Sequence, residues 1–128
     1  MKEFTSVMKS EAITVVNSTN TAVAVGSGSL PVYATPMMIA LMEEATCNAC
    51  APLLEEGETT VGTKISVSHD KASGTGATVT AYAALEEVDG RRLIFSVSAK
   101  DGDGNVIGKG EIERFVVLSE KFMKRVNG

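Results

Sequence analysis

The chain has 128 residues, of which 44% are hydrophobic, and it carries a formal net charge of −4. A chain of this length buries roughly two thirds of the surface that its unfolded form exposes, so we expect residues 1–128 to form one soluble globular domain without disulfide support. The sequence pI of about 5.0 argues against nucleic acid as a partner, because counterion-release binding requires a basic face.

The N-terminus, Met1 to Phe4, is not followed by a long apolar segment. The sequence therefore predicts neither a secretory signal nor a segment that spans a membrane, and we expect a cytoplasmic protein.

Two short extended segments are expected first, over residues 11–17 and 21–25, and a flexible Gly-Ser loop follows at 26–29. The only long helix is expected from Thr35 to about Ala51, because Thr35 can act as its N-cap and Pro36 suits the first helical position. Apolar and small side chains cover more than half of its circumference, which predicts burial on a wide face. These side chains belong to Met38, Ile39, Leu41, Met42, Ala45, Thr46 and Ala49.

Cys47 and Cys50 have the Cys-x-x-Cys spacing of redox and metal sites. Both lie deep in the expected helix, whereas a redox pair gains thiolate stability at a helix N-terminus. A zinc site would need more ligands than a chain with one histidine can supply. We interpret both as small buried apolar side chains and expect neither a metal nor a redox cofactor.

The second half of the chain predicts four antiparallel strands, over residues 59–71, 77–88, 91–100 and 105–118. The Asp89-Gly90 pair is a signal for a tight hairpin turn. Alternation places one set of side chains inward on the second and third of these strands: Val79, Ala81, Ala83, Leu85, Leu93, Phe95, Val97 and Ala99. A terminal helix is expected at 120–126, capped by Ser119, with Phe122, Met123 and Val126 covering the sheet.

One long helix among five or six long strands predicts an α+β fold in which a curved antiparallel sheet wraps around a central helix. Such a sheet leaves exposed edges, and pairing of two edges predicts a homodimer.

His69 is the only histidine, and it continues an apolar row on its strand. A period of two places Val61, Thr63, Ile65, Val67 and His69 on one face. An imidazole in that position can serve as donor, acceptor or base near neutral pH, although a structural core or rim histidine is the simpler interpretation from this pattern alone.

Three further residues are candidates for chemistry. Glu43 lies at the margin of the apolar helix face, where partial dehydration makes a carboxylate a stronger base or nucleophile; an ordinary boundary glutamate is an equal alternative. Thr35 precedes it by two turns, at a helix N-terminus that favours developing negative charge. Arg114 shares its strand face with Val106, Ile112, Val116 and Leu118, so its guanidinium requires a carboxylate, a phosphate or water, and a structural ion pair with Glu43 or another acid is favoured.

The chain resembles the fluoroacetyl-CoA thioesterase group of hot-dog-fold proteins in several segments. These are YATPMMIALME at 33–43, APLLE at 51–55, VGTKISVSH at 61–69, GRRL at 90–93, SVSA at 96–99 and the Glu113-Arg114 pair. By this resemblance the central helix is the hot-dog helix, and the active form is a dimer with sites at its interface. Thr35, Glu43 and His69 match the family's catalytic residues, Gly62 its active-site glycine, and Arg114 an arginine near the site.

The resemblance implies an acyl-CoA thioesterase that uses coenzyme A only as part of its substrate. The family's fluoroacetyl-specific enzyme has a phenylalanine-bearing lid before its threonine, whereas residues 26–31 here contain no aromatic side chain. We therefore expect a short or medium aliphatic acyl group, near Val32, Met37 and Met38, rather than a fluorinated substrate. Glu43 either attacks the thioester or activates water, and lysines such as Lys64 and Lys71 are available for the phosphates of coenzyme A. The alternatives are a non-hydrolytic acyl-CoA-binding module, or a hydratase or dehydratase on the same fold.

Overall fold

A computed structural model describes residues 1–4 and 7–128. The chain order of its elements is β1 (Lys9–Val15), α1 (Ala22–Val25), α2 (Thr35–Cys50), the 3-10 helix η1 (Ala51–Leu53), β2 (Glu58–His69), β3 (Thr78–Asp89), β4 (Arg92–Asp101), β5 (Val106–Leu118) and α3 (Ser119–Val126).

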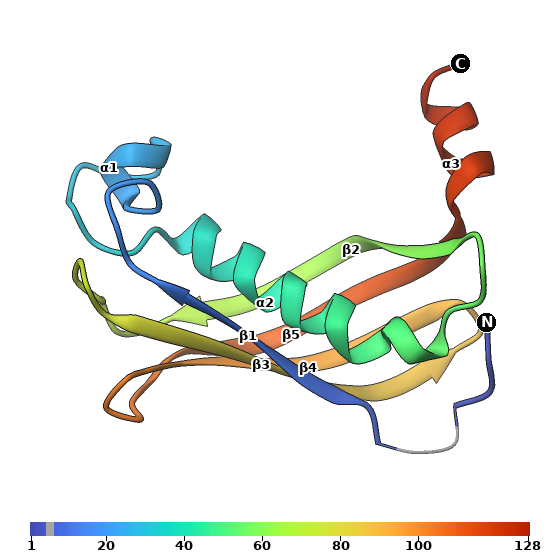
Figure 1. Cartoon of the computed structure of the whole chain (residues 1–128), viewed down its shortest axis with the longest axis horizontal. Helices are drawn as coiled ribbons and strands as arrows, with labels where there is room; N and C mark the ends of the chain where they lie inside the picture. The colour runs from blue at the N-terminus through green and yellow to red at the C-terminus, as the bar shows by residue number, and fades with distance from the viewer. Residues whose placement is uncertain (5–6) are drawn as a thin grey trace.

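The five strands form one antiparallel sheet in the order β1-β3-β4-β5-β2, and α2 lies across one face of it (Figure 1). Strands β1 and β2 are the two edges. The predicted arrangement of a curved antiparallel sheet around one long helix is therefore confirmed.

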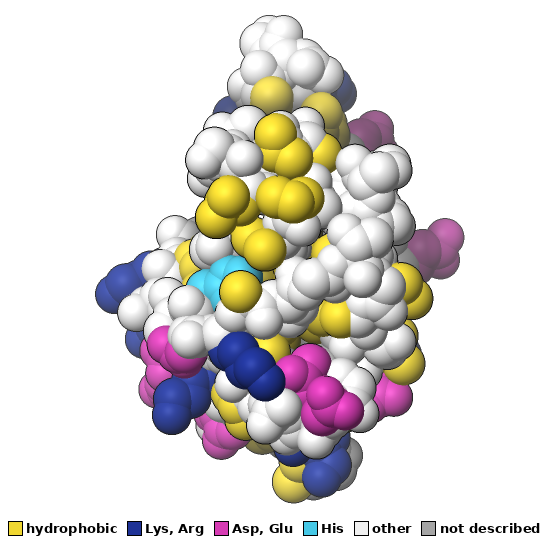
Figure 2. Space-filling model, turned by 90° about the vertical axis from the view of Figure 1, so that its left-hand side faces the viewer, with side chains coloured by type: hydrophobic (Ala, Val, Ile, Leu, Met, Phe, Trp, Pro, Cys, Tyr) yellow, Lys and Arg dark blue, Asp and Glu magenta, His cyan; other side chains and the backbone are white. Residues whose placement is uncertain are grey.

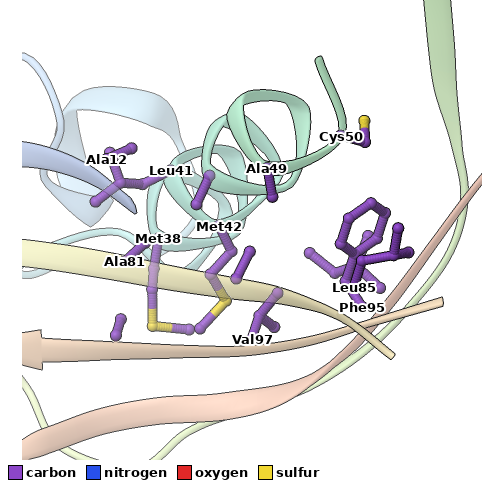
Figure 3. Close-up of a cluster of buried hydrophobic side chains, with 14 of the residues drawn as sticks. Ala12, Met38, Leu41, Met42, Ala49, Cys50, Ala81, Leu85, Phe95 and Val97 are labelled. Atoms are coloured by element: carbon purple, nitrogen blue, oxygen red, sulfur yellow. The ribbon is translucent and has the colours of Figure 1, made fainter. Parts of the chain in front are cut away.

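The core lies between α2 and the inner face of the sheet (Figure 3). All eight side chains that alternation placed inward on β3 and β4 are buried. On the helix, Met38 and Met42 are fully buried and reach toward the sheet, whereas Ile39 is only half-buried. The wide buried face predicted for the helix is thus confirmed, apart from its margin.

Strand β2 does not keep a single period of two, because its pairing with β5 shifts between Gly62 and Lys64. A bulge of this kind adds one unpaired residue, here Thr63, and reverses the facing of the residues after it. Val61 pairs with Phe115 on the outer face, whereas Gly62 pairs with the inward-facing Arg114. The prediction that Val61 and Thr63 share the face of His69 is therefore wrong.

A second irregularity, between Ala99 and Lys100 where β4 pairs with β5, changes the start of β5. Ile107 is fully buried and Val106 is 45% exposed, so Val106 does not share the inner face with Arg114 as predicted. Ile112 and Val116 are buried on that face, as expected.

Residues 21–25 are not an extended strand. Thr21 is the N-cap of α1, its hydroxyl accepts a hydrogen bond from the Ala24 N–H at 3.3 Å, and the helix ends at Gly26 with φ of 76°. The short turn is possible because Gly26 readily adopts this left-handed conformation. The Val-rich composition favoured a strand, but local capping at both ends overrides it.

Helix α3 also differs from the expectation. It has no buried residue, and Met123 and Val126 are 49% and 62% exposed. It extends away from the sheet beyond the end of β5 instead of covering it (Figure 1). Leu118 holds the N-cap position, and no side-chain cap from Ser119 is present.

No helix of the described residues has the length and apolar composition needed to cross a membrane.

Candidate active site

Thr35 and His69 form a hydrogen-bonded pair where the start of α2 meets the end of β2. Thr35 Oγ1 lies 2.8 Å from His69 Nδ1. The expected N-cap role of Thr35 is wrong, because the cap position belongs to Ala34 and Thr35 is already inside the helix. Its hydroxyl is directed to the imidazole instead, and this contact fixes the orientation of the ring.

The other ring nitrogen of His69, Nε2, is buried and has no hydrogen-bond partner among the described residues. Burial lowers the pKa of the imidazole, and a backbone contact with Lys71 and the charge of Asp70 oppose this shift only in part. The ring is therefore neutral at pH 7, with Nε2 as the atom that can exchange a proton with a reacting group.

His69 reaches the surface of a small hollow. The hollow has a volume of about 190 Å³, and its lining includes Ala22, Ser27, Val32, Thr35, His69 and Lys71. Figure 2 shows the imidazole in cyan on this face, with hydrophobic side chains gathered above it. Of the aliphatic residues expected near an acyl group, Val32 lines this hollow, whereas Met38 is fully buried in the core and Met37 lines a different one.

Glu43 and Arg114 form a second cluster, further along α2. Arg114 Nη1 donates to Glu43 Oε2 at 2.9 Å, and the predicted ion pair between these residues is confirmed. The arginine side chain is 8% exposed and the glutamate side chain 36%. The other carboxylate oxygen, Oε1, has no hydrogen-bond partner in the described part of the chain. It is therefore the oxygen available for attack or for proton abstraction.

Thr60 holds the other side of the guanidinium. Arg114 Nε donates to Thr60 Oγ1 at 2.8 Å, and Nη2 donates to the Thr60 carbonyl at 3.0 Å. The sequence interpretation omitted Thr60. Its position two residues before Gly62, on the same strand face, was the signal that could have identified it.

Gly62 faces the Glu43 carboxylate. A Cβ atom at this position would lie 2.5 Å from Glu43 Oε2 and 3.4 Å from Arg114 Nη1. The absence of a side chain is thus what leaves space for the ion pair.

We expect Gly62→Ala to displace the Glu43 carboxylate and to lower the turnover number of the expected acyl-CoA hydrolysis by about 10- to 100-fold. Small misplacements of reacting groups reduce rates by this much. Gly102→Ala is the matched control, because a Cβ at Gly102 would contact nothing within 4 Å. Steady-state kinetics and melting of both variants test the prediction, and wild-type turnover in Gly62→Ala would contradict it.

The two clusters are separate within one chain. Thr35 and Glu43 are eight residues apart on α2, which corresponds to about 12 Å along the helix axis. His69 and Gly62 lie at opposite parts of β2, about 20 Å apart along the strand. No hydrogen bond or ion pair in the described residues links Thr35 or His69 with Glu43. The three predicted catalytic residues are therefore not brought together by one copy of the chain.

Cys50 is buried, and burial raises the pKa of its thiol, so it is a neutral apolar side chain as predicted. Cys47 is exposed, which contradicts the prediction that both cysteines are buried. Its position on the outer side of α2 explains the difference. Among the described residues, no group of three or more His, Cys, Asp or Glu side chains is arranged to hold a metal ion.

Comparisons with a family model, with a curated relative and with solved structures agree with one another. The model of the family "Fluoroacetyl-CoA-specific thioesterase" matches residues 16–120. The fluoroacetyl-CoA thioesterase of Streptantibioticus cattleyicolor is 50% identical over 95 residues, which cover 74% of this chain and 68% of that protein.

Two solved structures have the same fold over nearly the whole chain. One is a hypothetical protein of Thermus thermophilus in the thioesterase superfamily, with a TM-score of 0.90, 29% identity, and coverage of 99% of this chain and 93% of that one. The other is a mutant of the fluoroacetyl-CoA-specific thioesterase FlK in complex with fluoroacetate and CoA. Its TM-score is 0.83 at 41% identity, and the match covers 89% of this chain and 95% of that one.

The family match extends over most of the chain, and the 50% identical relative is a fluoroacetyl-CoA thioesterase. The chain is therefore a hot-dog-fold thioester hydrolase that belongs to the fluoroacetyl-CoA-specific thioesterase family.

Proposed function

We propose that this chain, as one domain of residues 1–128, hydrolyses short acyl-CoA thioesters to the free acid and coenzyme A. The single observation that carries the proposal is the Glu43–Arg114 ion pair beside Gly62, which holds one carboxylate oxygen and leaves the other without a hydrogen-bond partner among the described residues. The similarity to a structure with bound CoA supports coenzyme A as the thiol part of the substrate.

In the proposed reaction Glu43 takes a proton from water as the water oxygen attacks the thioester carbonyl carbon, or attacks that carbon itself and is released by water. The tetrahedral oxyanion then collapses, the C–S bond breaks, and the coenzyme A thiolate takes up a proton. The proton taken from water passes to the neutral His69, held by Thr35, at Nε2, and the resulting imidazolium delivers it to the thiolate, so that Glu43 and His69 return to their starting states. The N–H of Gly62 is a candidate donor to the oxyanion. This chemistry requires no further cofactor.

The separation of the two clusters supports a homodimer with shared sites. Strand β2 is an edge of the sheet, and an edge strand offers unpaired backbone groups to a second copy. Antiparallel pairing of two β2 strands about an axis through Ser66, with Thr63 left as the unpaired bulge residue, sets His69 opposite Gly62 of the partner subunit. Residues directly opposite in such a pair point to the same face, here the face that α2 covers.

Each proposed site therefore combines Thr35 and His69 of one subunit with Glu43, Gly62 and Arg114 of the other. Light scattering should give a dimer. The proposal also includes a cytoplasmic location, which the free thiols of Cys47 and Cys50 support, since thiols persist in reducing compartments.

We expect butyryl-CoA to be a better substrate than acetyl-CoA, and fluoroacetyl-CoA to have no strong advantage over acetyl-CoA. Residues 26–31 contain no aromatic side chain, and Val32 lines the same hollow as His69. A small apolar substituent is worth only roughly 1–3 kcal/mol of discrimination even in a shaped pocket. A thiol-release assay gives kcat/KM for the three thioesters.

A preference for fluoroacetyl-CoA of several orders of magnitude would contradict the predicted selectivity while leaving hydrolysis intact. Tight acyl-CoA binding without thiol release would instead show a binding module, and conversion of an enoyl thioester without thiol release would show a hydratase.

A further inference from the structure

We propose that Thr60 is a positioning residue for hydrolysis, which acts by fixing the Arg114 guanidinium that in turn orients Glu43. The inference rests on the proposed function, and it assigns a role to a residue outside the five expected site residues.

The hydrogen bonds between Thr60 and Arg114 are buried, which makes them important for the orientation of the guanidinium. Thr60 is 8% exposed and Arg114 6% exposed. Arg114 makes three hydrogen bonds, and two of them go to Thr60, one to its hydroxyl and one to its carbonyl. A buried guanidinium must satisfy its donors, so its plane is set mainly by Thr60.

The register of the sheet explains this geometry. Arg114 pairs with Gly62, which has no side chain, and Thr60 is the diagonal neighbour on the same face. The arginine side chain therefore extends to Thr60 at one edge of its guanidinium and presents Nη1 to Glu43 at the other. If the hydroxyl of Thr60 is removed, Nε loses its acceptor and the guanidinium is free to rotate away from the carboxylate.

The test uses Thr60→Val, which keeps the shape and β-branching of threonine, and Thr60→Ser, which keeps the hydroxyl. We expect Thr60→Val to lower kcat by about 10-fold with KM changed less than about twofold, and Thr60→Ser to restore most of the rate, because only positioning of the reacting group is lost. In a Glu43→Gln background, Thr60→Val should lower the residual rate by less than about twofold, since coupled residues are not additive.

If the role of Thr60 were merely structural, kcat would fall in both Thr60→Val and Thr60→Ser, together with the melting temperature. Thr60→Val would then lower the rate by the same factor in the Glu43→Gln background as in the wild type. Wild-type kcat in Thr60→Val, an equal loss in Thr60→Ser, or additivity with Glu43→Gln would each overturn the proposal.

A second measurement does not depend on turnover. The Arg114 Nε–H signal in a ¹⁵N NMR spectrum, identified by its loss in Arg114→Lys, should be protected from solvent exchange in the wild type and Thr60→Ser. It should lose protection in Thr60→Val. If the wild type releases thiol from no acyl-CoA, the proposed function fails, and this spectrum alone decides whether Thr60 fixes the guanidinium. An unchanged signal in Thr60→Val overturns that claim as well.

Discussion

Glu43→Gln and His69→Ala should each lower the kcat of acyl-CoA hydrolysis by on the order of 100-fold or more, as expected when a base, nucleophile or proton donor is removed. Glutamine keeps an oxygen that can accept the hydrogen bond from Arg114 Nη1, but it neither takes up a proton nor attacks a carbonyl. Alanine at position 69 removes Nε2, the atom proposed to transfer the proton, and leaves the Thr35 hydroxyl without its partner.

The neighbouring Glu44→Gln is the matched control, because Glu44 is exposed on the same helix and lies outside both clusters. It should retain wild-type kcat. Thermal melting of all three variants separates loss of chemistry from loss of fold. Wild-type turnover in folded Glu43→Gln or His69→Ala would remove that residue from the mechanism.

The fold could be predicted from the sequence because its strongest signals are local and repeated. Alternation over β3 and β4 identified the inner face of the sheet, and the wide apolar face of α2 implied that a sheet wraps around it. The helix start near Thr35-Pro36 was also correct within a residue. These patterns depend only on which side chains face the core.

The structure differs from the sequence prediction where one extra residue changes the register of a strand, and where tertiary contacts determine the position of a helix. The bulge at Thr63 reverses the facing of β2, and no pattern within the strand announces it. Without that bulge, Gly62 and His69 could not both face α2. The bulge, which strand alternation did not predict, therefore sets the facing of these two candidate residues. Helix α3 has an amphipathic sequence. Amphipathicity alone does not specify which surface the apolar side contacts, or whether that surface belongs to the same chain.

The candidate residues themselves were identified from anomalies: an imidazole and a guanidinium on an apolar face, and a carboxylate at its margin. Their grouping into a Thr35–His69 pair and a Glu43–Arg114 pair could not be predicted, because it depends on the angle between α2 and β2. This grouping leads to a second prediction with a large effect.

Mixed dimers of Glu43→Gln and His69→Ala subunits should regain activity, although each variant alone has almost none. If a site takes Glu43 from one subunit and His69 from the other, every mixed dimer contains one intact site and one site that lacks both groups. Random assortment of equal amounts makes half of the dimers mixed, so we expect about a quarter of the wild-type kcat per subunit, because such a dimer has two symmetry-related sites. Two affinity tags on coexpressed subunits isolate the mixed dimers for assay.

The double variant Glu43→Gln/His69→Ala, mixed with wild-type subunits, gives a control of opposite sign. Every mixed dimer then has a defect in both shared sites, so equal mixing should lower the activity to about a quarter of the wild-type value, whereas sites built within single subunits would retain about half. Mixed dimers of the two single variants that stay as inactive as their parents would show that Glu43 and His69 act within one chain. In that case α2 and β2 would have to close the distance between the clusters when substrate binds.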